Sequence, residues 1–197
     1  MRSVKFLLLM ALAIPFISST TVNNSCTLSK DYVVTINGTS NLHNWTETVG
    51  TVSGNGSVSW NSDKTINLDA MKINMEVHSI KSTEGSIMNN NTYKALKADA
   101  NPEIIIALNS PIKSIKPQLN TAPVSVSANL TIAGVTKSIS IESKLSMQEQ
   151  GKLVFEGSKS INMTDYGIKP PTALFGTLKT GNEITISFKT NFTLASN

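Results

Sequence analysis

Few residues in this sequence have the chemistry of a catalytic or metal site. The two histidines, His43 and His78, lie far apart in the chain, and the single cysteine is Cys26. A zinc site needs three or four converging ligands, so we read both histidines as hydrogen-bonded or surface side chains and expect no metal and no cofactor. The chain has no G-x-S-x-G elbow, Walker A loop or His-Glu-x-x-His motif. We predict that it is not an enzyme, with a spatially assembled Ser-His-Asp hydrolase as the distant alternative.

Two tryptophans, Trp45 and Trp60, have side chains suited to an apolar ligand. Their rings could stack on a long hydrocarbon chain, or they could plug one end of a hollow fold. We favour the plug because buried tryptophan usually supplies packing area. Either role depends on the elements that carry these residues.

The first twenty residues have the pattern of a secretory signal peptide. Arg2 and Lys5 form a basic start, an apolar run follows from Phe6 to Phe16, and Ser18 to Thr20 supply small residues. The run is shorter than the roughly 20 residues that span a bilayer. We therefore expect residues 1–20 to be removed, the protein to be periplasmic or secreted, and residues 21–29, with Cys26 unpaired, to form a flexible tail.

Composition excludes several classes of protein. Hydrophobic residues make up 40% of the chain and charged residues 15%, which argues against disorder and against a coiled coil. The formal charge of +4 includes Arg2 and Lys5, so the mature chain carries only about +2, too little for a nucleic-acid binder. We predict a single soluble domain over residues 30–194 with no stable membrane anchor.

Apolar residues alternate with polar ones along most of this domain, which predicts strands with one buried face. The parity of one run changes between Leu68 and Met71, which indicates a β-bulge near Ala70. Residues 85–100 instead approach helical spacing and stop at Asn101-Pro102, which predicts one short helix. The main alternating sets are Tyr32, Val34 and Ile36; Val52 to Trp60; Val124 to Ile132; and Ile184 to Leu194.

Several runs are long, about 11 to 13 residues against a usual strand of 5 or 6. Long antiparallel strands with one apolar face tend to curl and close, because closure removes exposed edges. We predict an all-β, eight-stranded antiparallel barrel about 30 Å tall, with an apolar interior that few aromatic side chains fill. The residues expected to line it are Met71, Ile73, Met75, Val77, Val126, Ala128, Leu130, Ile132, Ile141, Phe155, Ile186 and Phe188.

Four segments of this chain resemble motifs of the YceI-like family, in the family's order. The similarity extends over about residues 30 to 194. The matching segments are Thr39–Trp45 (TSNLHNW), Asn101-Pro102 with the following Ile104–Ile106, Leu130–Lys137 (LTIAGVTK), and Asp165–Pro171 (DYGIKPP) continuing to Gly176.

This resemblance implies an extended lipocalin-like barrel that encloses an elongated apolar ligand, such as a polyisoprenoid or a prenylated quinone. Known members of the YceI-like family bind or carry lipids. The expected partner is thus an isoprenoid or other long-chain lipid, and a homodimer is left open. A filled structural or protein-interaction barrel with no ligand remains the alternative.

The arginine and lysine content also bears on the polar end of such a ligand. Arg2 is the only arginine, whereas bidentate recognition of a diphosphate favours arginine. We predict that a neutral-headed lipid binds at least as well as a polyprenyl diphosphate. The lysines that could supply point charges, or could simply be solvated, are Lys94, Lys97, Lys113, Lys116 and Lys169.

Overall fold

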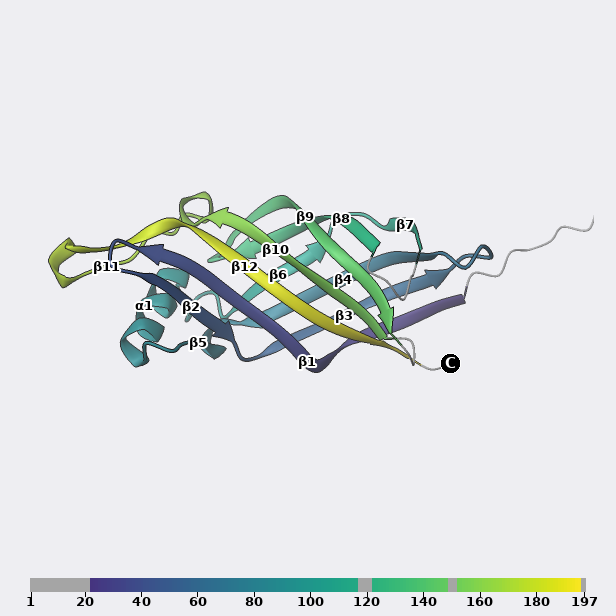
Figure 1. Cartoon of the computed structure of the whole chain (residues 1–197), viewed down its shortest axis with the longest axis horizontal. Coiled ribbons are helices and arrows are strands. Elements are labelled where there is room, and N and C mark those ends of the chain that lie inside the picture. The colour runs from purple at the N-terminus through teal and green to yellow at the C-terminus, as the bar shows by residue number, and fades with distance from the viewer. Residues whose placement is uncertain (1–21, 117–121, 149–151, 196–197) are drawn as a thin grey trace, which may run out of the picture.

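Hydrogen bonding between long antiparallel strands organises this chain, as the alternating pattern predicts. The computed structural model describes residues 22–116, 122–148 and 152–195 (Figure 1). The expected signal peptide at 1–20 lies outside the described residues. The elements in chain order are β1 (Val22–Ser40), β2 (Asn44–Val49), β3 (Val52–Trp60), β4 (Ile66–Glu76), η1 (Val77–Ser79), β5 (Ile80–Ser82), α1 (Ser86–Leu96), β6 (Glu103–Leu108), β7 (Ile112–Ile115), β8 (Ala122–Ile132), β9 (Val135–Gln148), β10 (Lys152–Asn162), η3 (Met163–Tyr166), β11 (Thr172–Ala173), η4 (Leu174–Gly176) and β12 (Leu178–Leu194).

The sheet closes on itself. Neighbouring strands run in the order β12-β10-β9-β8-β6-β4-β3-β1, and β1 pairs with β12 to complete the circuit. This is the predicted closed, eight-stranded antiparallel barrel with one helix. β2 and β5 prolong the wall at one end, where β2 pairs with the last residues of β1 and with β5.

The long β4 contains the predicted bulge. Ser57 of β3 faces Ala70, whereas the next residue, Val58, faces Leu68, so Asp69 is the extra residue. The insertion moves Leu68 and Met71 onto the same inward face although an odd number of positions separates them. This is the local change in register that a bulge produces.

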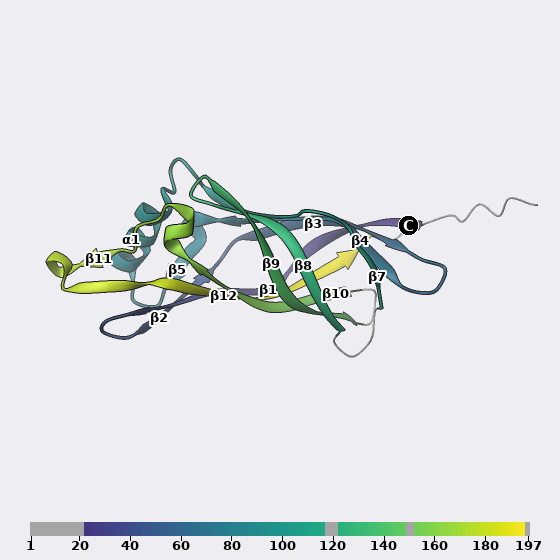
Figure 2. The same cartoon turned by 90° about the horizontal axis from the view of Figure 1, so that it is seen from above.

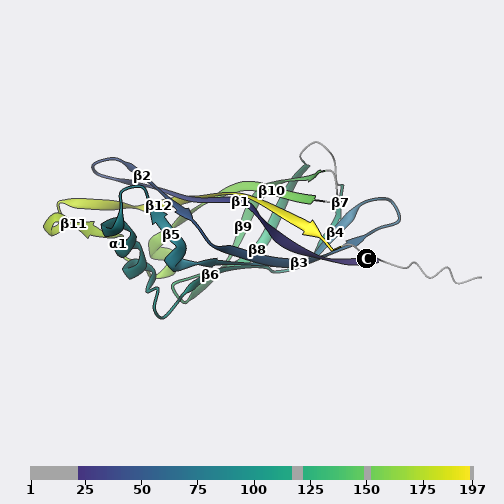
Figure 3. The ribbon, with the colours of Figure 1, turned by 90° about the horizontal axis from the view of Figure 1, so that it is seen from below.

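α1 lies at the same end of the barrel as β2, β5 and β11, whereas β7 and the described chain ends lie at the opposite end (Figures 1, 2 and 3). It ends earlier than the sequence predicts, because Lys97 adopts a left-handed conformation with φ of 54°. Hydrogen bonds tie it to η1 and β5: Asn89 accepts from the Ser82 amide at 2.7 Å, and the Tyr93 hydroxyl lies within hydrogen-bonding distance of the carbonyls of His78 and Ile80.

The start of β1 differs from expectation. Residues 22–27 pair with β3, and Cys26 is paired with Leu194 of β12 and with Gly56 of β3. The segment is therefore a strand of the barrel and not the flexible tail expected at 21–29. The tail was expected because its polar residues show no clear alternation, and Cys26 is buried because both neighbouring strands extend past it.

A Gly38→Ala substitution tests how the barrel wall is packed at the helix end. Gly38 pairs with Trp45 across β1 and β2, and a methyl group at Gly38 would lie 2.2 Å from an atom of the Trp45 ring. We expect a loss of about 1–3 kcal/mol in unfolding free energy, the usual cost of overpacking, measured by urea titration. The matched control is Gly54→Ala, where the nearest atom is 3.3 Å away; equal losses in the two variants would contradict this packing.

The reactivity of Cys26 tests the position of the first strand. Its side chain is 2% exposed, and burial raises the pKa of its thiol to about 11. Because only the thiolate reacts, we expect no labelling by a thiol reagent in the native protein at about pH 8 and full labelling after denaturation. Rapid labelling of the native protein would show instead that residues 22–29 are a tail.

Candidate ligand-binding site

Two apolar cavities lie inside the barrel. The helix-end cavity, beneath α1, has a volume of about 80 Å³, and the middle cavity has about 100 Å³. α1 contributes one helical face to the first cavity, at Met88, Asn91, Thr92, Ala95 and Leu96. This spacing of three and four residues places all five side chains on one side of a helix.

The two cavities are neighbours along the barrel axis. On four strands, consecutive inward residues line first one cavity and then the other, and on β12 the two lining residues flank Ile186. Because inward residues are two positions apart along a strand, the two spaces occupy adjacent levels of the barrel. Ile186 lines both. The pairs, helix-end residue first, are Ile36 and Val34 on β1, Ile104 and Ile106 on β6, Ile132 and Leu130 on β8, Ile161 and Lys159 on β10, and Ile184 and Phe188 on β12.

Most of the predicted lining residues lie at these cavities. Val77 and Ala128 are each 1% exposed but line neither cavity. Ile132 lines the helix-end cavity, and Ile186 lines both. The remaining predicted residues line the middle cavity: Met71, Ile73, Met75, Val126, Leu130, Ile141, Phe155 and Phe188.

The tryptophans lie in different parts of the barrel. Trp45 lines the helix-end cavity, where its indole nitrogen donates to the Thr39 carbonyl at 3.1 Å. Trp60 packs at the opposite end against a second cluster of buried residues, which includes Phe155 and Phe192 in an edge-to-face contact with centroids 5.8 Å apart. That cluster fills this end of the barrel, so the unfilled space begins at α1 and ends near Phe155.

The cavities are small. Each is smaller than an engineered cavity of about 150 Å³ that accepts benzene, and ligand pockets usually measure about 300–1,000 Å³. A long ligand can therefore enter only if inward side chains change rotamer. Flexible thioethers at Met71, Met75, Met88 and Met163 border the two spaces, and methionine adapts to such changes more readily than branched residues.

Glu47 is a buried acid in the wall of the helix-end cavity. It lies between Trp45 and Val49 on the inward face of β2, is 2% exposed, and accepts a hydrogen bond from the Thr92 hydroxyl at 2.5 Å. Burial raises the pKa of its carboxyl group; the Thr92 bond acts in the opposite direction, and the charge of Glu84 adds to the rise. Sequence reasoning missed this residue, although the parity of Trp45 and Val49 points to it.

Lys159 is a second polar residue that the sequence analysis missed. It lies inward on β10 between Gly157 and Ile161, is partly buried, and lines the middle cavity. The pairing of β10 with β9 ends at Gly157 and Ser143, so Lys159 lies where these two strands are no longer hydrogen-bonded. The period of the strand places it inside, but a lysine there is easily taken for a surface residue.

The lysines considered for a ligand head group fall into three places. Lys94, Lys97 and Lys169 line one surface groove beside α1, and that groove shares Asn91, Ala95 and Pro171 with the helix-end cavity. Lys113 forms an ion pair with Asp69 at 3.0 Å. Lys116 is exposed and directly follows β7, a strand at the end of the barrel opposite α1 (Figure 1).

The histidines do not meet. The His43 ring donates to the Asn44 carbonyl at 2.8 Å and lies 3.5 Å from Glu84. His78 contacts the ring of Tyr93 and lies 3.7 Å from Asp99. Among the residues that the structure describes, no three His, Cys, Asp or Glu side chains form a group able to hold a metal ion.

A closed barrel of long antiparallel strands with a helix at one end is the architecture of lipocalin-like barrels. The family model of the YceI-like domain matches residues 22–192, so the chain belongs to the YceI-like family. No curated protein matches the chain. In the described part of the chain, no helix has the length and apolar character needed to cross a membrane.

Solved structures of low sequence identity share the fold. A polyisoprenoid-binding domain from Saccharophagus degradans, implicated in plant cell wall breakdown, has a TM-score of 0.69 at 12% identity, covering 86% of this chain and 98% of that one. BcnA of Burkholderia cenocepacia has a TM-score of 0.56 at 15% identity, covering 84% and 96%. The YCEI protein of Campylobacter jejuni has 0.57 at 15%, covering 77% and 85%.

The pH dependence of stability tests the burial of Glu47. Because its pKa is raised in the folded state, the native protein holds this proton more tightly than the unfolded chain does. Stability is then lost as pH rises from the ordinary carboxyl pKa of 4.5 through the raised value. We expect Glu47→Gln to stabilise the protein at about pH 7 and to do so much less at about pH 4, measured by urea unfolding.

The control for this comparison is Glu156→Gln. Glu156 is exposed and lies 3.6 Å from Lys189 on the outer surface, so its removal should give no gain at neutral pH. If the difference in unfolding free energy between Glu47→Gln and the parent protein does not increase with pH, the burial of the Glu47 carboxyl group is contradicted.

Proposed function

We propose that this protein binds and carries an elongated apolar ligand, such as a polyisoprenoid or a prenylated quinone, along the axis of its barrel. The observation that carries the proposal is the row of two apolar cavities at adjacent levels of the barrel, which share Ile186 as a lining residue. From Thr180 at the first cavity to Thr190 at the second, β12 advances about 34 Å along its own direction, or roughly 25 Å along the axis of a barrel with typical tilt.

The binding energy in this proposal comes from burial of the ligand's hydrocarbon surface, about 25 cal/mol for each Å² removed from water. Part of that energy is offset by moving the side chains that now occupy the path. Methionines at the path keep this cost low because an unbranched thioether reaches several rotamers without clashes. The polyisoprenoid-binding domain of the same fold supports this ligand class.

We infer binding rather than catalysis. Membership of the YceI-like family supports this, as does the likeness in fold to a polyisoprenoid-binding domain. The acidic and the basic residue of the cavity walls, Glu47 and Lys159, line different cavities, so the interior does not present them as an acid–base pair.

We also propose that the protein works in the periplasm or outside the cell. The basic start, apolar run and small residues of the first twenty positions support this location. Fractionation of cells that express the full chain, with N-terminal sequencing of the product, tests the location. An uncleaved chain in the cytoplasm would contradict it.

The small volumes of the cavities favour a second candidate, a barrel that serves as a scaffold without a ligand. Native mass spectrometry of the protein purified without detergent separates the two. A lipid present at one copy per chain supports the carrier, whereas a ligand-free barrel that takes up no polyprenol when offered one supports the scaffold.

Ile186 offers a direct test because it separates the two cavities. We expect Ile186→Ala to join them and to raise the affinity for a polyprenol about tenfold, while costing about 2–4 kcal/mol of stability. Ile186→Phe should narrow the path and lower the affinity by a similar factor. Quenching of Trp45 fluorescence, which reports from the helix-end cavity, measures both.

The matched control is Val33→Ala, because Val33 is 57% exposed on the outer face of β1. It should leave the affinity unchanged. If the two Ile186 variants and the control all bind the polyprenol equally, the ligand does not pass along the axis.

A further inference from the structure

We propose that Glu47 holds the polar end of the ligand and selects a head group that donates hydrogen bonds, a hydroxyl or an ammonium, over an anionic one. The inference rests on the proposed function, because it assumes a long apolar chain in the barrel. It adds the direction in which that chain lies: its head beneath α1 and its tail past Ile186 toward Phe155.

The first support is geometric. Glu47 is among the most deeply buried side chains of the described chain and yet lines the helix-end cavity. Thr92 donates to one oxygen, Oε1, and no other hydrogen bond or ion pair reaches the carboxyl group within the described residues. The second oxygen, Oε2, is therefore available to a donor inside the cavity.

The second support is electrostatic. A buried carboxylate is costly unless donors or a positive charge surround it. Here the charge of Glu84 repels the carboxylate and adds to the rise of its pKa that burial causes. Two cationic groups of this end have other partners, since Lys81 donates to Tyr93 and His43 lies beside Glu84, and no ion pair joins Glu47 to a lysine or histidine within the described residues. The protein thus supplies one hydrogen bond where a carboxylate accepts several, and a donating ligand supplies the rest.

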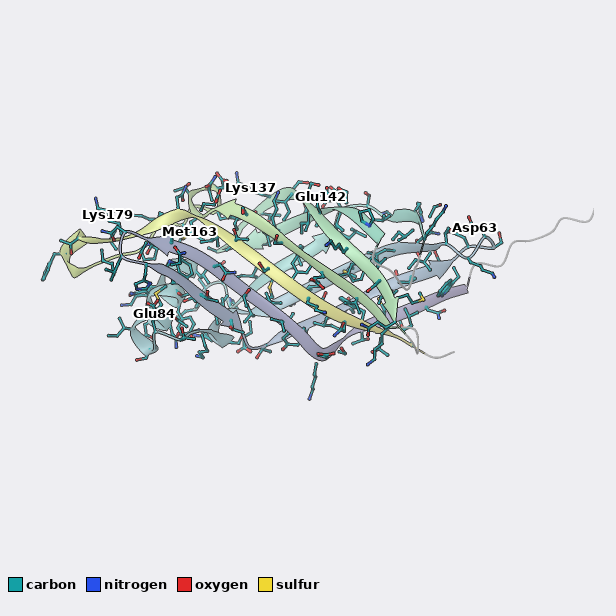
Figure 4. All side chains as sticks on the ribbon, viewed as in Figure 1. Asp63, Glu84, Lys137, Glu142, Met163 and Lys179 are labelled. Carbon is teal, nitrogen blue, oxygen red and sulfur yellow. The ribbon has the colours of Figure 1, made fainter. Side chains whose placement is uncertain are left out.

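The third support is the position of Glu47 along the path. Glu84, close to α1, and Met163, which lines the same cavity, both lie at the helix end of the barrel, whereas Asp63 lies at the far end (Figure 4). The far end is filled by the cluster around Phe192. A chain that enters from the helix end must put its tail in first, so its head comes to rest at the level of Glu47.

A competing arrangement would place an anionic head outside the cavity. Lys94, Lys97 and Lys169 line the surface groove that adjoins the helix-end cavity. A diphosphate could lie there, away from Glu47. These lysines are exposed, and exposed lysines interact weakly through solvent. The buried acid is the stronger determinant, and the experiment separates the two arrangements.

The test uses three probes with the same twenty-carbon isoprenoid tail: geranylgeraniol, geranylgeranylamine and geranylgeranyl diphosphate. We expect the full mature chain to bind the alcohol and the amine at least about tenfold more tightly than the diphosphate. Glu47→Gln, which keeps the shape but removes the charge, should weaken the amine about tenfold and narrow the preference over the diphosphate. Glu156→Gln on the outer surface is the matched control and should change none of the three affinities.

A fourth protein, the Thr92→Val variant, shows whether Glu47 recognises the ligand or only joins β2 to α1 through its hydrogen bond with Thr92. Thr92→Val removes the hydrogen bond but leaves the carboxyl group, so the amine should bind at least as tightly as before. If Thr92→Val and Glu47→Gln weaken all three probes equally, Glu47 only holds α1 in place and the inference fails.

Two other results are possible, and they overturn different proposals. Preference for the diphosphate that is lost when Lys94, Lys97 and Lys169 are changed to Gln would overturn the inference in favour of the surface groove, while leaving the carrier function intact. Failure of the unaltered protein to bind any of the probes, or any longer polyprenol, would overturn the carrier function itself.

Discussion

Closure of the sheet between the first and last long strands is the constraint on which the rest of this structure depends. β1 and β12 are antiparallel partners from Cys26 and Leu194 to Ser40 and Thr180. Without that pairing, two long edges would expose unpaired amide and carbonyl groups. With it, alternate side chains of every long strand face one axis. The side chains inside the barrel are thus those of the alternate set of residues that faces inward on each strand.

That axis is filled unequally. At the end away from α1, Phe155 and Phe192 contact each other in a cluster with fully buried aliphatic residues, and little space remains. At the other end the inward residues are mostly isoleucine, and α1 closes the barrel with Met88 and Leu96. Trp45 and Tyr166 are the aromatic residues that line the helix-end cavity, and they leave part of the space unfilled. The acid Glu47 lies at this less filled end, where water or a ligand group can approach it. A local conflict between residue type and environment of this kind is commoner at functional sites than in a structural core.

Much of the fold could be predicted from the sequence because period-two alternation is a local property. The parity of Val124 to Ile132 and of Ile184 to Phe188 placed the right residues inside, and the change of parity after Leu68 located the bulge at Asp69 to within one residue. The helix was predicted too long because its end depends on the left-handed turn at Lys97. The tail expected around Cys26 was wrong because a strand with a polar sequence is recognisable only once its two neighbours are known.

The sequence by itself determined that the chain forms long, one-sided strands, which side of most strands is apolar, and to which family the chain belongs, since each follows from local residue patterns. Only the tertiary structure decided that the cavities adjoin along the axis, that the far end is filled, and that Glu47 is shielded beneath Thr92 of α1. These features depend on contacts between residues far apart in the chain. Their register is set by closure of the whole barrel and not by any single segment.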